Sequence, residues 1–247
     1  MPESLNHDHL YVVLVAARNP LNIGAAARAM SNFGFSRLRV VNPYSLPFRE
    51  ARSAVGAAEL LQQADECATL ADAVADCSLV VGTSALHHRE LRHPVYRLEK
   101  AAQLIRTELN TGRVALVFGS EKRGLSKEDL SHCHWILRIP TREEHSSMNL
   151  GQAVAVCLYE LAHTREEVKI RPESAEEGRL ASSADLERLN QILLQSLQAS
   201  GYVKQGAEAA TQGNVRRLLR RFNLQAIDAE LLLGMMRKVL WKLKQHR

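Results

Sequence analysis

The 247 residues suffice for one large domain, or for one medium and one small domain, and 46% of them are hydrophobic, enough for a sizeable core. No continuous apolar run reaches membrane-spanning length, and the N-terminal segment MPESLNHDHL lacks the basic-then-apolar pattern of a secretory signal. We therefore expect a soluble, cytoplasmic protein with no membrane partner.

The four cysteines and the charges give two further expectations. Cys67, Cys77, Cys133 and Cys157 form no C-x-x-C pair, so we expect free thiols and no metal site. Residues 201–247 hold ten Lys or Arg and three acidic residues, a net charge of +7, which leaves −2 for residues 1–200. A basic tail on a near-neutral body indicates either a polyanionic partner or a solvated helical surface.

Alternating strands and helices are predicted over the first two-thirds of the chain. Short, β-branched-rich apolar runs predict strands at 10–17, 38–41, 78–81, 113–118 and 134–139. Helices are expected at 23–33, capped by Asn22, and at 51–64, 70–75, 98–109 and 150–164, with a short one capped by Ser126. Uninterrupted apolar strands between helices predict an α/β fold with a parallel sheet covered on both faces.

Small polar loops follow three of these strands. They are Gly82-Thr83-Ser84, Gly119-Ser120-Glu121, and the segment after Ile139 that leads through 145–149 into the helix at 150–164. Ligands of parallel sheets bind beyond the carboxyl ends of the strands, so a cofactor is expected at these loops. Ser and Asn before a helix are also ordinary N-caps, which leaves simple capping open for the last loop.

The C-terminal third is predicted to be a linker and three helices. Charge, Pro and Gly mark residues 166–183 as a linker, and amphipathic patterns predict helices at 184–200, 214–222 and 225–244. Four arginines are expected on one face of the middle helix, where they contact phosphates or solvent: Arg216, Arg217, Arg220 and Arg221.

The common nucleotide-binding and hydrolase motifs are missing from the sequence. There is no G-x-G-x-x-G after the first strand, no G-x-x-x-x-G-K-[ST] and no G-x-S-x-G. Ser147 with His145 as its base is a poor nucleophile pair, because two residues of one loop have unsuitable geometry and no orienting acid is evident.

Three other segments are informative through their order and spacing. They are Asn19-x-x-Asn22-x-Gly24-x-x-x-Arg28-x-Met30, then Phe118-Gly119-Ser120-Glu121-x-x-Gly124-Leu125-Ser126, then Ile139-Pro140 followed by SSMNLGQAV at 146–154. Together they resemble motifs 1, 2 and 3 of the SPOUT RNA methyltransferases, in the branch that methylates ribose 2′-hydroxyls. The resemblance spans about residues 9–165 and is specific because all three motifs are present.

The resemblance implies a fold, a cofactor and an assembly. The domain at 1–165 is expected to be an α/β sheet with a C-terminal trefoil knot, followed by the linker at 166–183 and a small all-α basic domain at 184–247. The implied cofactor is S-adenosylmethionine, and the implied assembly is a homodimer whose sites are completed by the partner subunit. The implied cofactor-binding residues are Thr83, Ser84, Ala85, Gly119, Ser120, Glu121, Ile139, Ser146, Ser147 and Met148.

The resemblance also implies a reaction and its residues. The implied catalytic set is Arg28, Asn22, Glu121, Ser147 and Asn149. Segments 40–43 and 79–85 are most similar to the bacterial tRNA enzymes of this family that methylate nucleotide 32 of the anticodon loop, so tRNA is the expected partner. Two alternatives stay open: methylation of ribosomal RNA, and a non-catalytic RNA-binding protein with the same fold.

Overall fold

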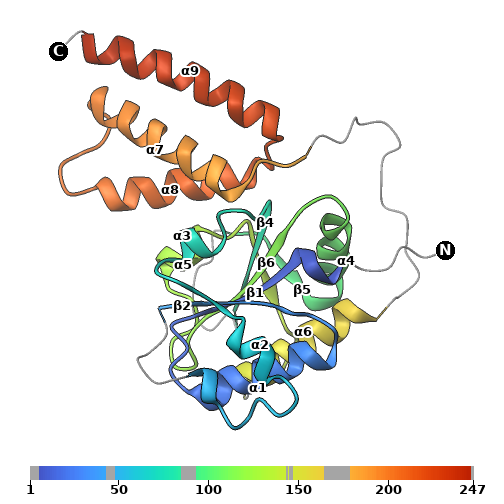
Figure 1. The fold of residues 1–247 in the computed structure, drawn as a ribbon. Coiled ribbons are helices and arrows are strands. Elements are labelled where there is room, and N and C mark those ends of the chain that lie inside the picture. Colours follow the sequence, from blue (N-terminus) through green and yellow to red (C-terminus); the bar gives the residue numbers. More distant parts are fainter. Residues whose placement is uncertain are drawn as a thin grey trace.

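A seven-stranded parallel sheet forms the centre of the protein (Figure 1). The computed structural model describes residues 6–42, 48–84, 93–142, 144, 147–163 and 179–245. The strand order is β3-β2-β1-β6-β4-β7-β5, and every adjacent pair is parallel. The strands are β1 (Leu10–Val15), β2 (Arg37–Val41), β3 (Asp65–Cys67), β4 (Leu79–Thr83), β5 (Val95–Arg97), β6 (Val114–Phe118) and β7 (Trp135–Arg138).

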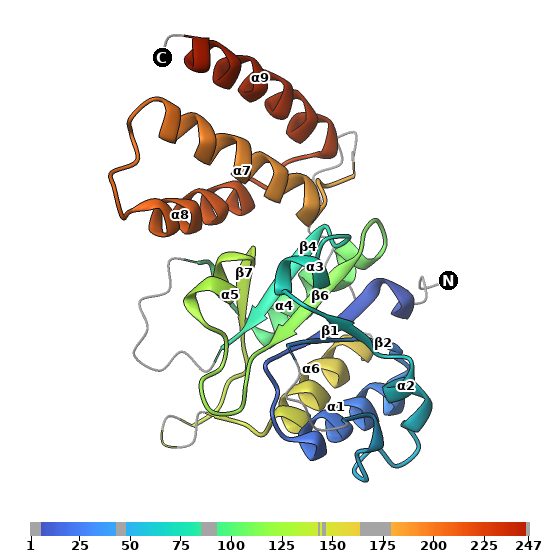
Figure 2. The ribbon, with the colours of Figure 1, turned by 60° about the vertical axis from the view of Figure 1, so that its left-hand side comes forward.

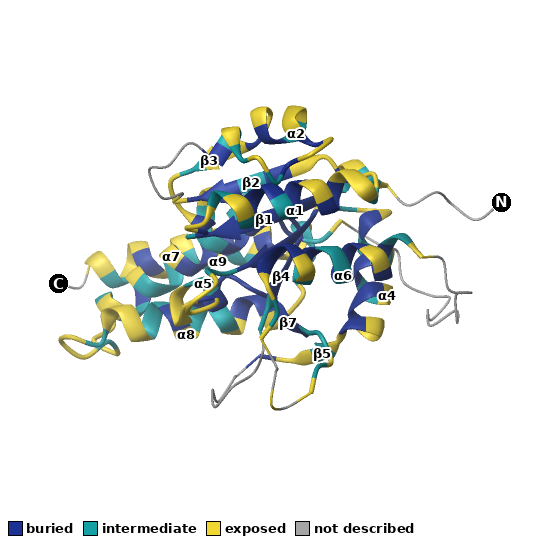
Figure 3. Ribbon diagram, turned by 90° about the horizontal axis from the view of Figure 1, so that it is seen from below, coloured by how far each residue is buried: buried dark blue, intermediate teal, exposed yellow. Residues whose placement is uncertain are grey.

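Helices cover both faces of the sheet, as the unbroken apolar strands predicted. On β1, Leu10, Val12 and Leu14 face one core and Tyr11 and Val13 face another. The first core includes α1 (Pro20–Asn32), α2 (Ala58–Gln62), α4 (Leu98–Leu109) and α6 (Leu150–Ala162). The second includes α3 (Leu70–Ala73) and α5 (Lys127–Ser131). The central strands are therefore buried between the helices, whose outer sides are exposed (Figure 3).

Several predicted boundaries differ from the structure. The edge strands β3 and β5 were missed because each has three residues and an exposed or half-buried surface, without an apolar run. The helix predicted at 51–64 is wrong over its first half: a 3-10 turn occupies Phe48–Glu50, and the helix begins only at Ala58. Between them Gly56 has φ +76°, which breaks helical geometry.

The start of α1 is also a correction. Asn22 does not cap this helix; Asn19 does, because its side chain accepts a hydrogen bond from the Leu21 amide and Pro20 takes the first helical position. Asn22 lies inside the first turn. Its side chain is therefore available for contacts outside the helix.

Three helices, α7 (Ser183–Ala199), α8 (Glu208–Arg221) and α9 (Ala226–Gln245), form a C-terminal helical unit. It lies on the side of the sheet that carries α3 and α5, away from α1 and α6 (Figures 1 and 2). Its two small cores, around Leu186 and Leu189, are separate from the cores of the sheet. Residues 179–182, which we assigned to the linker, pack with it: Ala181 is buried and its amide donates to Leu224 O. Among the described residues, no helix is long and apolar enough to cross a membrane.

Candidate active site

A cavity of about 320 Å³ lies at the carboxyl ends of three neighbouring strands, β6, β4 and β7. The loops after these strands form most of its wall, and the start of α6 closes it. Its lining comprises Thr83, Ser84, Phe118, Gly119, Ser120, Glu121, Lys122, Arg123, Gly124, Leu125, Leu137, Ile139, Ser147, Met148, Leu150 and Ala153. The structure thus has a cavity at the position expected for a ligand of a parallel sheet.

Most of the predicted cofactor-binding residues line this cavity. The structure brings together Thr83, Ser84, Gly119, Ser120, Glu121, Ile139, Ser147 and Met148. Ala85 and Ser146 lie outside the described residues. Lys122 and Arg123 also line the cavity, but the sequence did not single them out, because the second motif leaves these two positions unspecified. Their place between Glu121 and Gly124 could have indicated that they face the cofactor.

A tight turn after β6 shapes one wall. The Gly124 amide donates to Ser120 O at 2.7 Å, which folds the loop back on itself, and Gly124 has φ +64°. A Cβ atom on Gly119 would lie 2.1 Å from the carbonyl carbon of Gly124 and 2.2 Å from the Leu125 amide nitrogen. Both glycines are therefore required by the backbone itself.

Three segments that are distant in sequence are joined by a chain of side-chain hydrogen bonds. The Asn149 amide group donates to Asn22 Oδ1 at 2.9 Å, and the Asn22 amide group donates to Glu121 Oε1 at 2.8 Å. Asn149 also accepts from the Gly151 amide at 2.9 Å and so caps α6. The network links α1, the loop after β6, and the start of α6 beside the cavity.

Glu121 is held in its charged form. Partial burial alone would raise its pKa, but hydrogen bonds from the Asn22 side chain and from backbone amides, including those of Arg18 and Asn19, lower the pKa below its ordinary value. The result is a fixed negative charge at the cavity wall. Such a charge favours a cationic ligand group and keeps the loops around it ordered.

Arg28 is not brought to this cavity. It is exposed on α1, and it is not among the described residues that line the cavity. Asn22, Glu121, Ser147 and Asn149, the other predicted catalytic residues, lie at the cavity or in its hydrogen-bond network.

The expected exposed face of four arginines on α8 is wrong for two of them. Arg216 and Arg220 have 6% and 1% of their surface exposed, because this side of α8 packs against α5 and α7. Arg221 is exposed and Arg217 is half-buried. Within the parts of the chain that the structure describes, no cluster of three or more His, Cys, Asp or Glu residues has the arrangement of a metal site.

The fold and the site define an α/β protein with a cavity of small-molecule size across the carboxyl ends of adjacent parallel strands. Residues 9–159 match the model of the SpoU rRNA Methylase family, so the chain belongs to the SpoU methylase family. This confirms the resemblance drawn from the three motifs.

Similar proteins of known name span nearly the whole chain. The tRNA (cytidine/uridine-2'-O-)-methyltransferase TrmJ of Yersinia pestis (strain Pestoides F) is 35% identical over 94% of this chain and 91% of its own length. The structure of TrmJ from Z. mobilis ZM4 is 32% identical, covers 93% of this chain and 98% of that one, and has a TM-score of 0.81. A probable methylase family protein from Haemophilus influenzae is 27% identical, covers 98% of this chain and all of its own, and has a TM-score of 0.56.

Proposed function

We propose that this protein transfers a methyl group from S-adenosylmethionine to a ribose 2′-hydroxyl of tRNA. One observation carries the proposal: the second and third motif segments line one cavity, and the first, far from both in the sequence, is joined to them beside it by the Asn149–Asn22–Glu121 hydrogen bonds. Relatives of 35% identity over nearly the whole chain are named tRNA (cytidine/uridine-2'-O-)-methyltransferases, which supports tRNA as the substrate.

The cavity residues fit the cofactor. A volume of about 320 Å³ lies within the usual range of small-molecule sites. Gly119 has no room for a side chain because the backbone of Gly124 and Leu125 packs against it, so the loop that lines the cavity is tightly folded. Thr83, Ser84 and Ser120 offer hydroxyl groups, and Leu137 and Ile139 offer apolar surface for a base. The charged Glu121 suits a ligand with cationic groups.

When bound, S-adenosylmethionine supplies a methyl group that is already activated by its sulfonium. The remaining work of the protein is to orient a ribose hydroxyl in line with that methyl and to help remove its proton. Ser147 and Asn149 lie at the N-terminal end of α6, and we assign to them the binding of the target ribose or of the methionine part of the cofactor. Asn22 and Glu121 fix the loops that hold both reactants.

Arg28 requires a second subunit under this proposal. It projects from the exposed side of α1, where Leu21 is also 55% exposed. A homodimer that buries this face brings Arg28 to the partner's cavity and completes the site. Arginine is a poor base in water, so Arg28 either contacts substrate phosphate or acts as a base after losing its proton to its surroundings.

The finer features of the fold belong to the same proposal. We assign residues 1–165 to a methyltransferase domain with a trefoil knot, 166–178 to a linker, and residues 179–182 with the helical unit that follows to a separate basic all-α domain. The separate cores of the helical unit support the division. A tRNA substrate agrees with a cytoplasmic protein.

The surface that contacts tRNA is assigned to the helical unit. Arg217 and Arg221 remain from the predicted arginine face. The last turns of α9 add four exposed cations, Arg237, Lys238, Lys242 and Lys244. Such cations bind nucleic acid mainly through the phosphate backbone, whatever the sequence.

The proposal is tested by incubating total tRNA and ribosomal RNA separately with the protein and S-adenosylmethionine labelled in its methyl group. We expect ribose 2′-O-methylation of tRNA, mapped to nucleotide 32. Labelled ribosomal RNA alone would move the substrate to that RNA, and a methylated base would overturn the reaction class. Calorimetry with S-adenosylmethionine tests the non-catalytic alternative, for which no binding is expected.

A further inference from the structure

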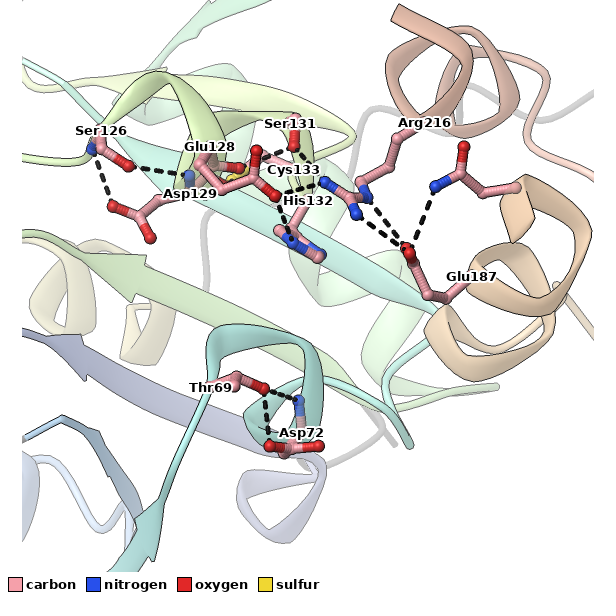
Figure 4. Close-up of polar contacts among 11 residues, drawn as sticks. Thr69, Asp72, Ser126, Glu128, Asp129, Ser131, His132, Cys133, Glu187 and Arg216 are labelled. Carbon is pink, nitrogen blue, oxygen red and sulfur yellow. Dashed lines mark hydrogen bonds and ion pairs between the residues drawn. The ribbon is translucent and has the colours of Figure 1, made fainter. Parts of the chain in front are cut away.

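A buried arginine joins the helical unit to the methyltransferase part of the chain. Arg216 of α8 donates from Nη1 to Glu128 Oε1 at 2.6 Å and to Ser131 Oγ at 2.9 Å, both on α5. From Nε and Nη2 it donates to the two carboxylate oxygens of Glu187 on α7, at 2.9 and 3.0 Å. Figure 4 shows its guanidinium between the two glutamates.

The contact is polar, and it is enclosed on the Glu187 side, whereas the side chain of Glu128 is 68% exposed. The side chain of Arg216 is 7% exposed, and that of Glu187 19%. Burial alone would lower the pKa of Arg216, but Glu187 and Glu128 outweigh it and raise that pKa; the arginine in turn keeps the pKa of Glu187 low. Removing either member of the Arg216–Glu187 pair leaves the other charged and desolvated, which is strongly unfavourable.

A second arginine on the same face bonds within the helical unit, at Ser183, whose own amide donates to Cys77 O of the methyltransferase part at 2.8 Å. Arg220, 1% exposed, donates from Nη1 to Ser183 Oγ at 3.1 Å, and burial lowers its pKa to about 10. Among the described residues, the hydrophobic clusters of the helical unit share no member with those of the sheet. Directional polar contacts therefore determine how α8 sits on α5.

The helix that receives Arg216 is continuous with the cavity wall. Ser126 caps α5 through a capping box with Asp129, so α5 begins directly after Gly124 and Leu125, which line the cavity. Leu125 is buried in the same cluster as Leu130 and Cys133, at the end of α5 and just beyond it. A shift of α5 moves this cluster, and with it the wall of the cavity.

We propose that Arg216 is a positioning residue that couples the docking of the helical unit to the shape of the cofactor cavity. The path runs from Arg216 through Glu128 and α5 to Gly124 and Leu125. The identity of the ligand rests on the proposed function. Because such coupling is reciprocal, cofactor binding also strengthens the docking of α8 on α5. The unit proposed to hold tRNA thereby adjusts the site that holds the methyl donor.

The first test is Arg216→Gln in the full chain, with S-adenosylmethionine affinity measured by calorimetry. We expect Kd and the KM for the cofactor to rise about tenfold, within the usual range of coupling between sites, with a smaller change in kcat. Arg188→Gln is the matched control, since Arg188 is an exposed arginine of the same unit that pairs with Asp185 of its own helix. We expect its affinity to equal that of the wild type.

A second variant covers the case in which Arg216→Gln unfolds the helical unit. Glu128→Gln removes the charged α5 partner and leaves in place the Arg216–Glu187 pair and the hydrogen bond from Arg216 to Ser131 Oγ. We expect a loss of cofactor affinity in the same direction as for Arg216→Gln, with helical content and Tm near the wild type.

Hydrogen exchange of the backbone amides of residues 119–131 tests the positioning role of Arg216 without depending on the proposed function. Without ligand, we expect faster exchange there in Glu128→Gln than in the wild type. If the wild type binds no S-adenosylmethionine, the proposed function fails, while this exchange still decides the positioning role. Unchanged cofactor affinity, or unchanged exchange over 119–131, in folded Glu128→Gln would overturn the coupling.

Discussion

Asn149 and Asn22 lie 127 positions apart in the sequence, and the amide group of Asn149 donates to Asn22 Oδ1 at 2.9 Å. The same Asn149 accepts from the Gly151 amide and caps α6. One side chain therefore has two tasks, a local one in its own helix and a long-range one at the cavity. The two tasks respond differently to substitution.

Asn149→Ala is expected to cost far more activity than stability. Loss of an N-cap destabilises a protein by about 1 kcal/mol, whereas loss of the hydrogen bond to Asn22 also frees the Asn22–Glu121 pair at the cavity. We expect methyl transfer to fall at least ~100-fold, which corresponds to about 2.7 kcal/mol of transition-state stabilisation. Ser182→Ala is the control, since Ser182 caps α7 away from the cavity. Equal losses of activity in the two variants would reduce Asn149 to a simple cap.

Gly119→Ala is expected to abolish cofactor binding. The added methyl group would lie 2.1 Å from the Gly124 carbonyl carbon, so the loop after β6 must open to accept it. Gly234→Ala is the same chemical change on α9, where a Cβ meets no atom within 4 Å. Because alanine favours helix more than glycine, this control is expected to be neutral or stabilising by up to about 1 kcal/mol. Calorimetry and thermal unfolding of both variants are the measurements; wild-type affinity in Gly119→Ala would contradict the placement of the cofactor.

Arg28→Ala is expected to leave cofactor affinity unchanged and to remove most methyl transfer, because Arg28 is exposed on α1 outside its own cavity. Mixing Arg28→Ala with Asn149→Ala tests the dimer. If Arg28 acts on the partner's cavity, each mixed dimer has one intact site, so activity returns. Absence of any recovery, with mixed dimers demonstrated by mass spectrometry of tagged subunits, would mean that Arg28 does not act across subunits.

Neutralising Arg217 and Arg221 together is expected to weaken tRNA binding and to flatten its salt dependence, while cofactor affinity persists. Removing one arginine that binds a phosphate reduces the slope of log K against log salt concentration by about 1. Filter binding of the double glutamine variant at several salt concentrations measures that slope. A slope equal to that of the wild type would mean that these two arginines do not contact phosphates, and would leave α9 as the region that binds tRNA.

Acid is expected to destabilise the protein between about pH 6.5 and pH 4 in part through His132. Burial, together with the charges of Arg216 and Arg220, lowers the pKa of His132 to about 4, although Glu187 opposes this and Glu128 lies 3.7 Å away. Its unfolded pKa is about 6.5, so in this window the unfolded state binds the proton and stability falls as the pH falls.

Thermal unfolding of His132→Gln across this pH range measures the effect. We expect a shallower loss of Tm on acidification than in the wild type, though not a flat profile, because burial also lowers the pKa of His93 and His134. Parallel profiles for variant and wild type would exclude His132 as a source of the acid sensitivity.

The sequence by itself determined the parallel sheet and the position of the site. Runs such as 10–15 and 114–118 are apolar on both sides, which only a doubly covered strand tolerates, and small polar loops follow three such runs. Gly119 and Gly124 stand out in the second motif, and the structure supplies the reason, because a backbone that turns this tightly accepts no side chain. These are local constraints, so the residues themselves carry them.

Only the tertiary structure decided which side chains meet. Asn22 reads as a helix cap, and its true partners, Glu121 and Asn149, come from distant segments. Arg216 and Arg220 read as part of a charged outer face, yet both are buried, where Arg216 bonds carboxylates and a hydroxyl group of α5 and α7 and Arg220 bonds a hydroxyl group of α7. The charge pattern of one helix contains no information about what packs against it, so burial and pairing of these arginines follow from the arrangement of the whole chain.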